Sequence, residues 1–83
     1  MMSLDKINAV IVSFLLANRS SLYEEIRGDW AHLTFERLAL DSLDLTALSL
    51  DVEDELEIEI GLDDLQACET LGGLRDWILS RTP

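Results

Sequence analysis

The stretch LDSLDLTALSLDVEDEL, residues 40–56, decides the fold of this chain of 83 residues. Asp41 can accept hydrogen bonds from the free amides of a helix that starts at Ser42. Asp44 would lie in the first turn, where the helix dipole favours a negative charge. Apolar residues mark one face at steps of three and four: Leu45, Leu48, Val52 and Leu56. Most acids fall outside this stripe, so the segment predicts an amphipathic and strongly acidic helix.

The residues before this helix divide into a first helix and a long connection. Apolar residues recur at helical spacing over residues 4–18, with Ser3 as the candidate N-cap. The periodicity fades over residues 19–40, where we expect a loop with one irregular turn at residues 22–26. So long a loop in so small a domain needs apolar anchors. The candidates are Tyr23, Ile26, Trp30, Leu33, Phe35 and Leu38.

The residues after the acidic helix predict one short helix and one last helix. Residues 57–60 alternate like a strand, but four residues without a partner are better explained as an extended link to Gly61. A short helix should begin at Leu62 or Asp63 and end near Cys68, and Thr70 can cap a final helix. We therefore expect a single all-α domain over residues 1–83, a bundle of four helices with a long loop between the first two and a short third helix.

The charge of the chain excludes one class of partner and suggests another. Six Lys and Arg residues against seventeen Asp and Glu residues give a formal charge of −11, which would repel a nucleic acid backbone. No basic residue occurs between Arg37 and Arg75. Such asymmetry suggests a face that recruits basic proteins. Solvated helix faces are the commoner explanation of acidic runs, so docking needs support from a neighbouring chemical signal.

Catalytic, metal-binding and membrane-spanning signals are weak. Cys68 is the only cysteine, which excludes an internal disulfide and fits a reducing cytoplasm. Cys68 and His32 lie on different predicted elements with no motif around either, so we expect no enzyme activity. The acidic pairs Asp63-Asp64 and Glu57/Glu59 lack the pattern of a calcium loop. The N-terminus does not have the pattern of a secretory leader, and no stretch is long enough to span a membrane.

The segment LTFERLALDSLD, residues 33–44, resembles the acyl carrier protein family. Phe35 and Leu38 stand at that family's spacing from its modified serine, which would be Ser42 here. The likeness continues at Ile60 and in the pairs Asp63-Asp64 and Thr70-Leu71. The resemblance implies the fold described above, in a free-standing and monomeric carrier. It also implies that a phosphopantetheinyl transferase attaches a 4′-phosphopantetheine arm from coenzyme A to Ser42, and that the thiol of this arm carries cargo as a thioester.

The resemblance also implies a surface for partner enzymes. These partners would be a ligase or transferase that loads an acyl or aminoacyl group, and the synthases that act on it afterwards. The residues carried over by position are Asp41, Leu43, Asp44, Leu50, Glu53 and Asp54. A second set of residues, all apolar, could line a groove for the cargo or could simply form the core, and both explanations are equally good. Its members are Leu48, Val52, Leu56, Ile60, Leu65 and Leu71.

Several positions depart from the family and leave the cargo open. Ala39 replaces a usual glycine, Thr46 is polar where an apolar residue is usual, Ala47 stands where an acid is common, and Gly61 stands where fatty-acid carriers often have proline. Carriers for fatty acids, polyketides, peptides or amino acids therefore all remain open, and a secondary pathway is at least as well supported as fatty acid synthesis. The alternative from another class is an unmodified acidic adaptor that binds a basic partner through its second helix.

Overall fold

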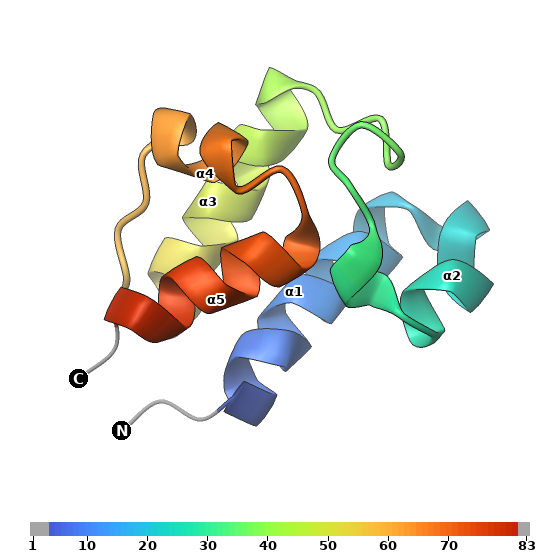
Figure 1. The fold of residues 1–83 in the computed structure, drawn as a ribbon, viewed down its shortest axis with the longest axis horizontal. Helices are drawn as coiled ribbons and strands as arrows, with labels where there is room; N and C mark the ends of the chain where they lie inside the picture. Colours follow the sequence, from blue (N-terminus) through green and yellow to red (C-terminus); the bar gives the residue numbers. More distant parts are fainter. Residues whose placement is uncertain (1–3, 82–83) are drawn as a thin grey trace.

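A computed structural model describes residues 4–81, which form five α-helices and two 3₁₀ turns. Figure 1 shows the helices in chain order from blue to red. The described part contains one isolated antiparallel bridge, between Thr34 and Thr70, and no longer strand. The helices are α1 (Leu4–Asn18), α2 (Tyr23–Arg27), α3 (Ser42–Leu56), α4 (Leu62–Cys68) and α5 (Leu71–Arg81), and the turns are Ser20–Leu22 and Trp30–His32.

The helix boundaries agree with the local signals in the sequence. The long acidic helix, α3, begins at Ser42, and Leu62 opens the short helix α4. The N–H group of Gly73 donates to Oγ1 of Thr70 at 2.9 Å, which confirms Thr70 as the cap of α5. Residues 57–60 lie in no helix or strand, as expected for a link, but Glu57 is not extended: with a φ of 56° it ends α3 in the left-handed region. The candidate cap Ser3 lies outside the described residues.

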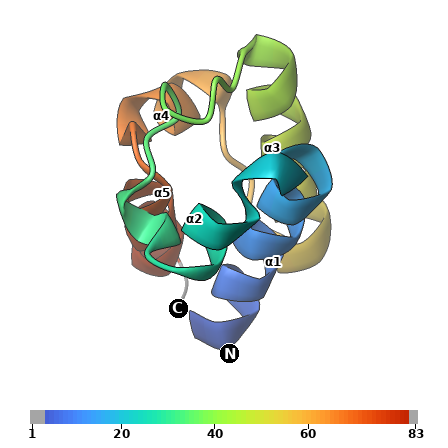
Figure 2. The same cartoon turned by 90° about the vertical axis from the view of Figure 1, so that its right-hand side faces the viewer.

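The core lies where α1, α3, α4 and α5 meet, and α1 packs against both α3 and α5 (Figures 1 and 2). Each helix supplies the apolar residues that its periodicity marks, such as Ile7 and Ile11 from α1 and Ile78 from α5. All six residues considered for a cargo groove are at most 7% exposed. They belong to the core, and burial of their apolar area is the main force that holds the helices together.

The long loop is anchored largely as expected, but it contains a helix of its own. Ile26, Phe35 and Leu38 are buried, whereas Trp30 and Leu33 are partly buried against the core. Tyr23 is 47% exposed, so the expectation that it anchors the loop was wrong; its ring lies under the guanidinium of Arg27 instead. The irregular turn expected at residues 22–26 is the short helix α2.

The last helix approaches the loop closely at one glycine. A Cβ atom on Gly72 would lie 2.8 Å from the carbonyl oxygen of Ala31, in the 3₁₀ turn that packs on α5. Figure 2 shows this part of the loop running beside α5. Glycine at this position therefore allows a contact between backbones, in addition to weakening the first turn of α5.

Candidate functional site

Ser42 is the first residue of α3 and its side chain is exposed. Asp41 and Asp44 form a reciprocal capping box around it. The N–H group of Asp44 donates to Oδ1 of Asp41 at 2.9 Å, and the N–H group of Asp41 donates to Oδ2 of Asp44 at 3.3 Å. No described residue makes a hydrogen bond with the Ser42 hydroxyl. The serine therefore presents an accessible hydroxyl group on a rigidly capped helix end.

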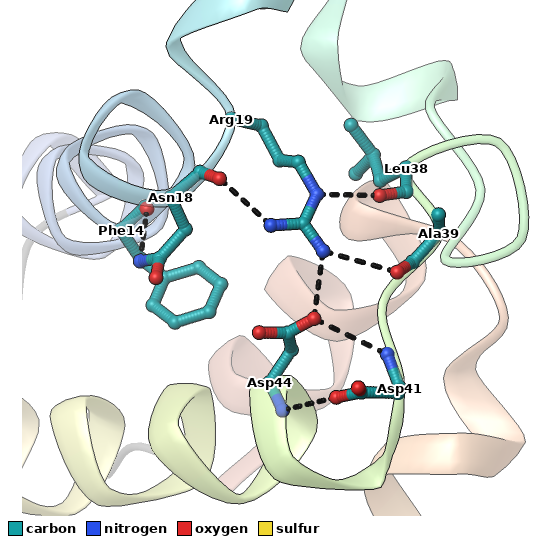
Figure 3. Close-up of polar contacts among 7 residues, drawn as sticks. All are labelled: Phe14, Asn18, Arg19, Leu38, Ala39, Asp41 and Asp44. Atoms are coloured by element: carbon teal, nitrogen blue, oxygen red, sulfur yellow. Dashed lines mark hydrogen bonds and ion pairs between the residues drawn. The ribbon is translucent and has the colours of Figure 1, made fainter.

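The side chain of Arg19 joins this helix end to two other segments (Figure 3). Its Nε donates to the carbonyl oxygen of Leu38 at 2.7 Å, and its Nη2 donates to that of Ala39 at 3.0 Å. Its Nη1 donates to the carbonyl oxygen of Asn18 at 2.7 Å, at the end of α1. The same Nη2 is paired with Oδ2 of Asp44 at 2.7 Å. We call this set of contacts the Arg19 clamp.

The clamp changes the electrostatics of the first turn of α3. The hydrogen bond from Arg19 is the main reason that the pKa of Asp44 lies below its usual value, and the backbone of Asp41 adds to the effect. Asp44 is only 25% exposed in its side chain. Two of the six residues expected to meet partner enzymes are therefore used by the fold: Asp44 is paired with Arg19, and the Asp41 carboxylate accepts the capping hydrogen bond.

The five expected partner-binding residues other than Asp44 are exposed together on or beside α3. Leu43 is 79% exposed and Leu50 is 52% exposed, and their spacing of seven residues places both on one side of the helix. Leu50 thus lies off the buried stripe, as expected. Asp54 shares this side and Glu53 flanks it, so we call Leu43, Leu50, Glu53 and Asp54 the outer face of α3.

A shallow cleft of about 420 Å³ lies on another side of α3, against the loop and α4. Leu45, one helical turn after Ser42, contributes to its wall. The other lining residues are Thr34, Phe35, Glu36, Gln66 and Glu69. All of them except Phe35 are polar or acidic. This cleft is therefore mixed in character, whereas the apolar residues considered for a groove are packed inside.

The remaining candidate groups are accounted for by local contacts. Burial raises the pKa of the Cys68 thiol, whose Sγ donates to the carbonyl oxygen of Asp64 at 3.3 Å. His32 lies 3.0 Å from a carboxylate oxygen of Asp29 on the surface. Over residues 4–81, no cluster of three or more His, Cys, Asp or Glu side chains is placed to hold a metal ion. Within the same residues, no helix is long and apolar enough to cross a membrane.

The contacts of Arg19 were not predicted from the sequence, in which it is only the first residue of the long loop. The partners of Arg19 lie 19, 20 and 25 residues further along the chain, so no local pattern identifies them. One available signal was its position as a basic residue directly after a helix, where free carbonyl groups attract cations. That signal accounts for the bond to Asn18 but not for the others.

The described residues form a small, acidic, all-helical domain with an exposed serine at the start of α3. Residues 22–78 match the family described as "Phosphopantetheine attachment site", which covers most of the chain. The chain therefore belongs to this family of phosphopantetheine-binding carrier proteins, and its cofactor is a covalently attached 4′-phosphopantetheine. No solved structure matches the chain.

Proposed function

We propose that Ser42 carries the phosphopantetheine arm and that residues 1–83 act as one carrier domain. The observation that carries this proposal is the exposed Ser42 hydroxyl at the first turn of α3, within the part of the chain that matches the family. When the arm is bound, its terminal thiol holds cargo as a thioester. The domain presents this cargo to other enzymes and catalyses no step itself.

The residues around Ser42 fit a phosphodiester. The first amides of α3 point out of the helix end, where backbone N–H groups and the helix dipole favour an anion. Asp44 lies in the same turn, but its negative charge is compensated by Arg19. The loaded serine would therefore meet free amides at the helix end, beside a carboxylate that is already paired.

The attachment step forms one bond and breaks one. The Ser42 oxygen bonds to the phosphorus atom that bears the pantetheine part of coenzyme A, and the pyrophosphate P–O bond on the nucleotide side breaks. Adenosine 3′,5′-bisphosphate leaves with the electron pair of that bond, and the serine proton passes to a base of the transferase or to water. Coenzyme A supplies the arm and the transferase supplies the catalytic groups.

The outer face of α3 is our proposed docking surface for the transferase, the loading enzyme and the later synthases, together with Asp41 at the helix cap. Its acids would attract basic patches and accelerate encounter, while Leu43 and Leu50 would add apolar contact. The cargo would be an acyl or aminoacyl group of fatty acid, polyketide or other secondary metabolism. The single cysteine fits a reducing compartment, so we place this work in the cytoplasm.

Intact mass spectrometry tests the attachment site. The protein is incubated with coenzyme A and a phosphopantetheinyl transferase, as wild type, Ser42→Ala and Ser49→Ala. Ser49 is the matched control because it lies on the same helix and its Oγ donates to the carbonyl oxygen of Thr46. We expect wild type and Ser49→Ala to gain the mass of one phosphopantetheinyl group, and Ser42→Ala to gain none.

Two results would overturn the proposal. Modification of Ser42→Ala would place the arm elsewhere, and unmodified wild type with several transferases would instead favour an acidic adaptor that binds basic proteins. Once the loaded form exists, trials with a panel of acyl and amino acid ligases would narrow the cargo. Acceptance of amino acids alone would exclude an acyl role.

A further inference from the structure

Arg19 holds the chain on both sides of Ser42. Its guanidinium bonds to the carbonyl oxygens of Leu38 and Ala39 before the serine, and to the Asp44 carboxylate after it. Figure 3 shows these groups converging on one side chain from separate segments. A planar guanidinium suits this task because its five N–H donors point in fixed directions, whereas a lysine ammonium is a single point charge.

Backbone hydrogen bonds close the turn before Ser42, including one from the N–H group of Ala39 to the carbonyl oxygen of Glu36 at 3.0 Å. Ala39 has a φ of 53°, in the left-handed region that residues with a Cβ atom rarely occupy. Its side chain is exposed, so no packing of that side chain holds the turn. The bond from Arg19 to the Ala39 carbonyl oxygen adds a side-chain restraint to this strained turn and ties it to the first turn of α3.

We propose that Arg19 is a positioning residue for the transfer of phosphopantetheine to Ser42. The clamp fixes the turn at Ala39 and the first turn of α3 as one unit, and so fixes the path of the Ser42 hydroxyl relative to the outer face of α3. A transferase that docks on this face then finds the hydroxyl in line for attack. This inference rests on the proposed attachment at Ser42.

The two kinetic constants of the transferase separate positioning from simple stabilisation. The carrier is the substrate, so a variant that is partly unfolded lowers the concentration of competent substrate and raises the apparent KM at unchanged kcat. Loss of positioning acts after docking, because the clamp does not use the residues of the outer face. It should lower kcat and leave KM nearly unchanged, since misplaced reacting atoms slow the chemical step.

The experiment compares Arg19→Met, Arg19→Lys and Arg27→Met with the wild-type protein. Arg27→Met is the matched control, because it removes the same charge from an exposed residue whose guanidinium lies over the Tyr23 ring. For Arg19→Met we expect kcat to fall about tenfold with KM within about twofold of wild type, as expected when reacting atoms are misplaced. Arg19→Lys keeps the positive charge but loses the fork of N–H donors, so its kcat should fall nearly as much as that of Arg19→Met. Arg27→Met should behave as wild type.

Hydrogen exchange of backbone amides gives a second measurement. Exchange in Arg19→Met should become faster at residues 39–41 and 44–45, whose N–H groups are hydrogen-bonded in the turn and the helix cap, and stay unchanged at the buried centre of α3, around Leu48. A kcat within about twofold of wild type in both Arg19 variants, or a deficit confined to KM, would overturn the inference. Failure of wild type to accept the arm would overturn the proposed function instead, so the two failures are distinguishable.

Discussion

Arg19 and Asp44 are 25 residues apart in the chain and meet at 2.7 Å, through Nη2 and Oδ2. The pair joins the end of α1 to the first turn of α3, and the same guanidinium bonds to the end of the loop between them. Three segments are thereby tied together beside Ser42. Because one member of the pair is a titratable carboxylate, its contribution to stability depends on pH.

Acid should weaken this ion pair. The hydrogen bond from Arg19 lowers the pKa of Asp44 from its usual value of 3.8. A group whose pKa is lower in the folded chain stabilises the fold above its unfolded pKa and loses this effect as pH falls through the folded pKa. The difference in unfolding free energy between wild type and Asp44→Asn should therefore stay constant from neutral pH to about 5 and shrink at lower pH. Urea unfolding at matched ionic strength measures it, and a difference that persists undiminished at about pH 2 would contradict the assignment.

Glycine in place of Ala39 should stabilise the protein. The left-handed conformation of Ala39 costs an L-residue about 1–2 kcal/mol, whereas glycine loses about 0.5–1 kcal/mol more backbone entropy on folding. We expect Ala39→Gly to raise the unfolding free energy by about 0.5–1 kcal/mol. The matched variant Ala47→Gly, in the exposed middle of α3, should lower it by about 0.5–1 kcal/mol. Equal losses in both variants would show that position 39 is not strained.

Two leucines on α3, two residues apart, should separate stability from docking. Leu48 is fully buried, so Leu48→Ala should lower the unfolding free energy by about 2–5 kcal/mol. Leu50 is 52% exposed, so Leu50→Ala should change it by about 0.5 kcal/mol or less. If the outer face docks the transferase, Leu50→Ala should nevertheless raise the KM for modification. Denaturant unfolding and transferase kinetics test both statements, and a Leu50→Ala protein with normal KM would argue against apolar docking at this position.

The sequence predicted those parts of the fold that depend on near neighbours. The caps at Asp41 and Thr70 each bond to an amide three residues further on, so a local pattern identifies them and the start of α3 at Ser42. The buried face of α3 was predicted in the same way, from apolar residues that recur at steps of three and four. The exposed side of Leu43 and Leu50 then follows as the remainder of that helix surface. The return bond from the Asp41 N–H group to the Asp44 carboxylate was not predicted.

The other missed features join residues that are distant in the chain. Arg19 reaches across the loop to Asp44, and Gly72 fits against Ala31 because α5 and the loop happen to pack there. Tyr23 is aromatic but exposed, whereas Ile26, three residues further on, is fully buried. The internal use of Asp44 was missed for the same reason: an acid in the first turn of a helix does not reveal which cation the fold brings to it.

The contact at Gly72 should tolerate no side chain. A Cβ atom there would approach the Ala31 carbonyl oxygen to 2.8 Å, and the neighbour is backbone rather than a flexible side chain. We expect Gly72→Ala to lower the unfolding free energy by about 1–3 kcal/mol, the range for overpacked sites. Gly61→Ala is the matched control, because the nearest atom to its Cβ would be an Asp64 carboxylate oxygen at 3.8 Å. Thermal or urea unfolding distinguishes them, and equal stability of the two variants would contradict the close contact.

The acids of the outer face should control the rate of encounter with the transferase. Glu53 is exposed and its carboxylate forms no hydrogen bond or ion pair with residues 4–81, whereas reversal of Asp44 would also release Arg19. We expect Glu53→Lys to lower kcat/KM for modification several-fold at low salt, mainly through KM, because like charges would then face the basic patch of the enzyme. Glu59→Lys, in the exposed link after α3, makes the same change in net charge and should have a smaller effect. The wild-type rate should fall as added salt shortens the screening length, and the gap between the two proteins should close. Rates that are insensitive to salt, or equal for both lysine variants, would mean that total charge or apolar contact governs docking.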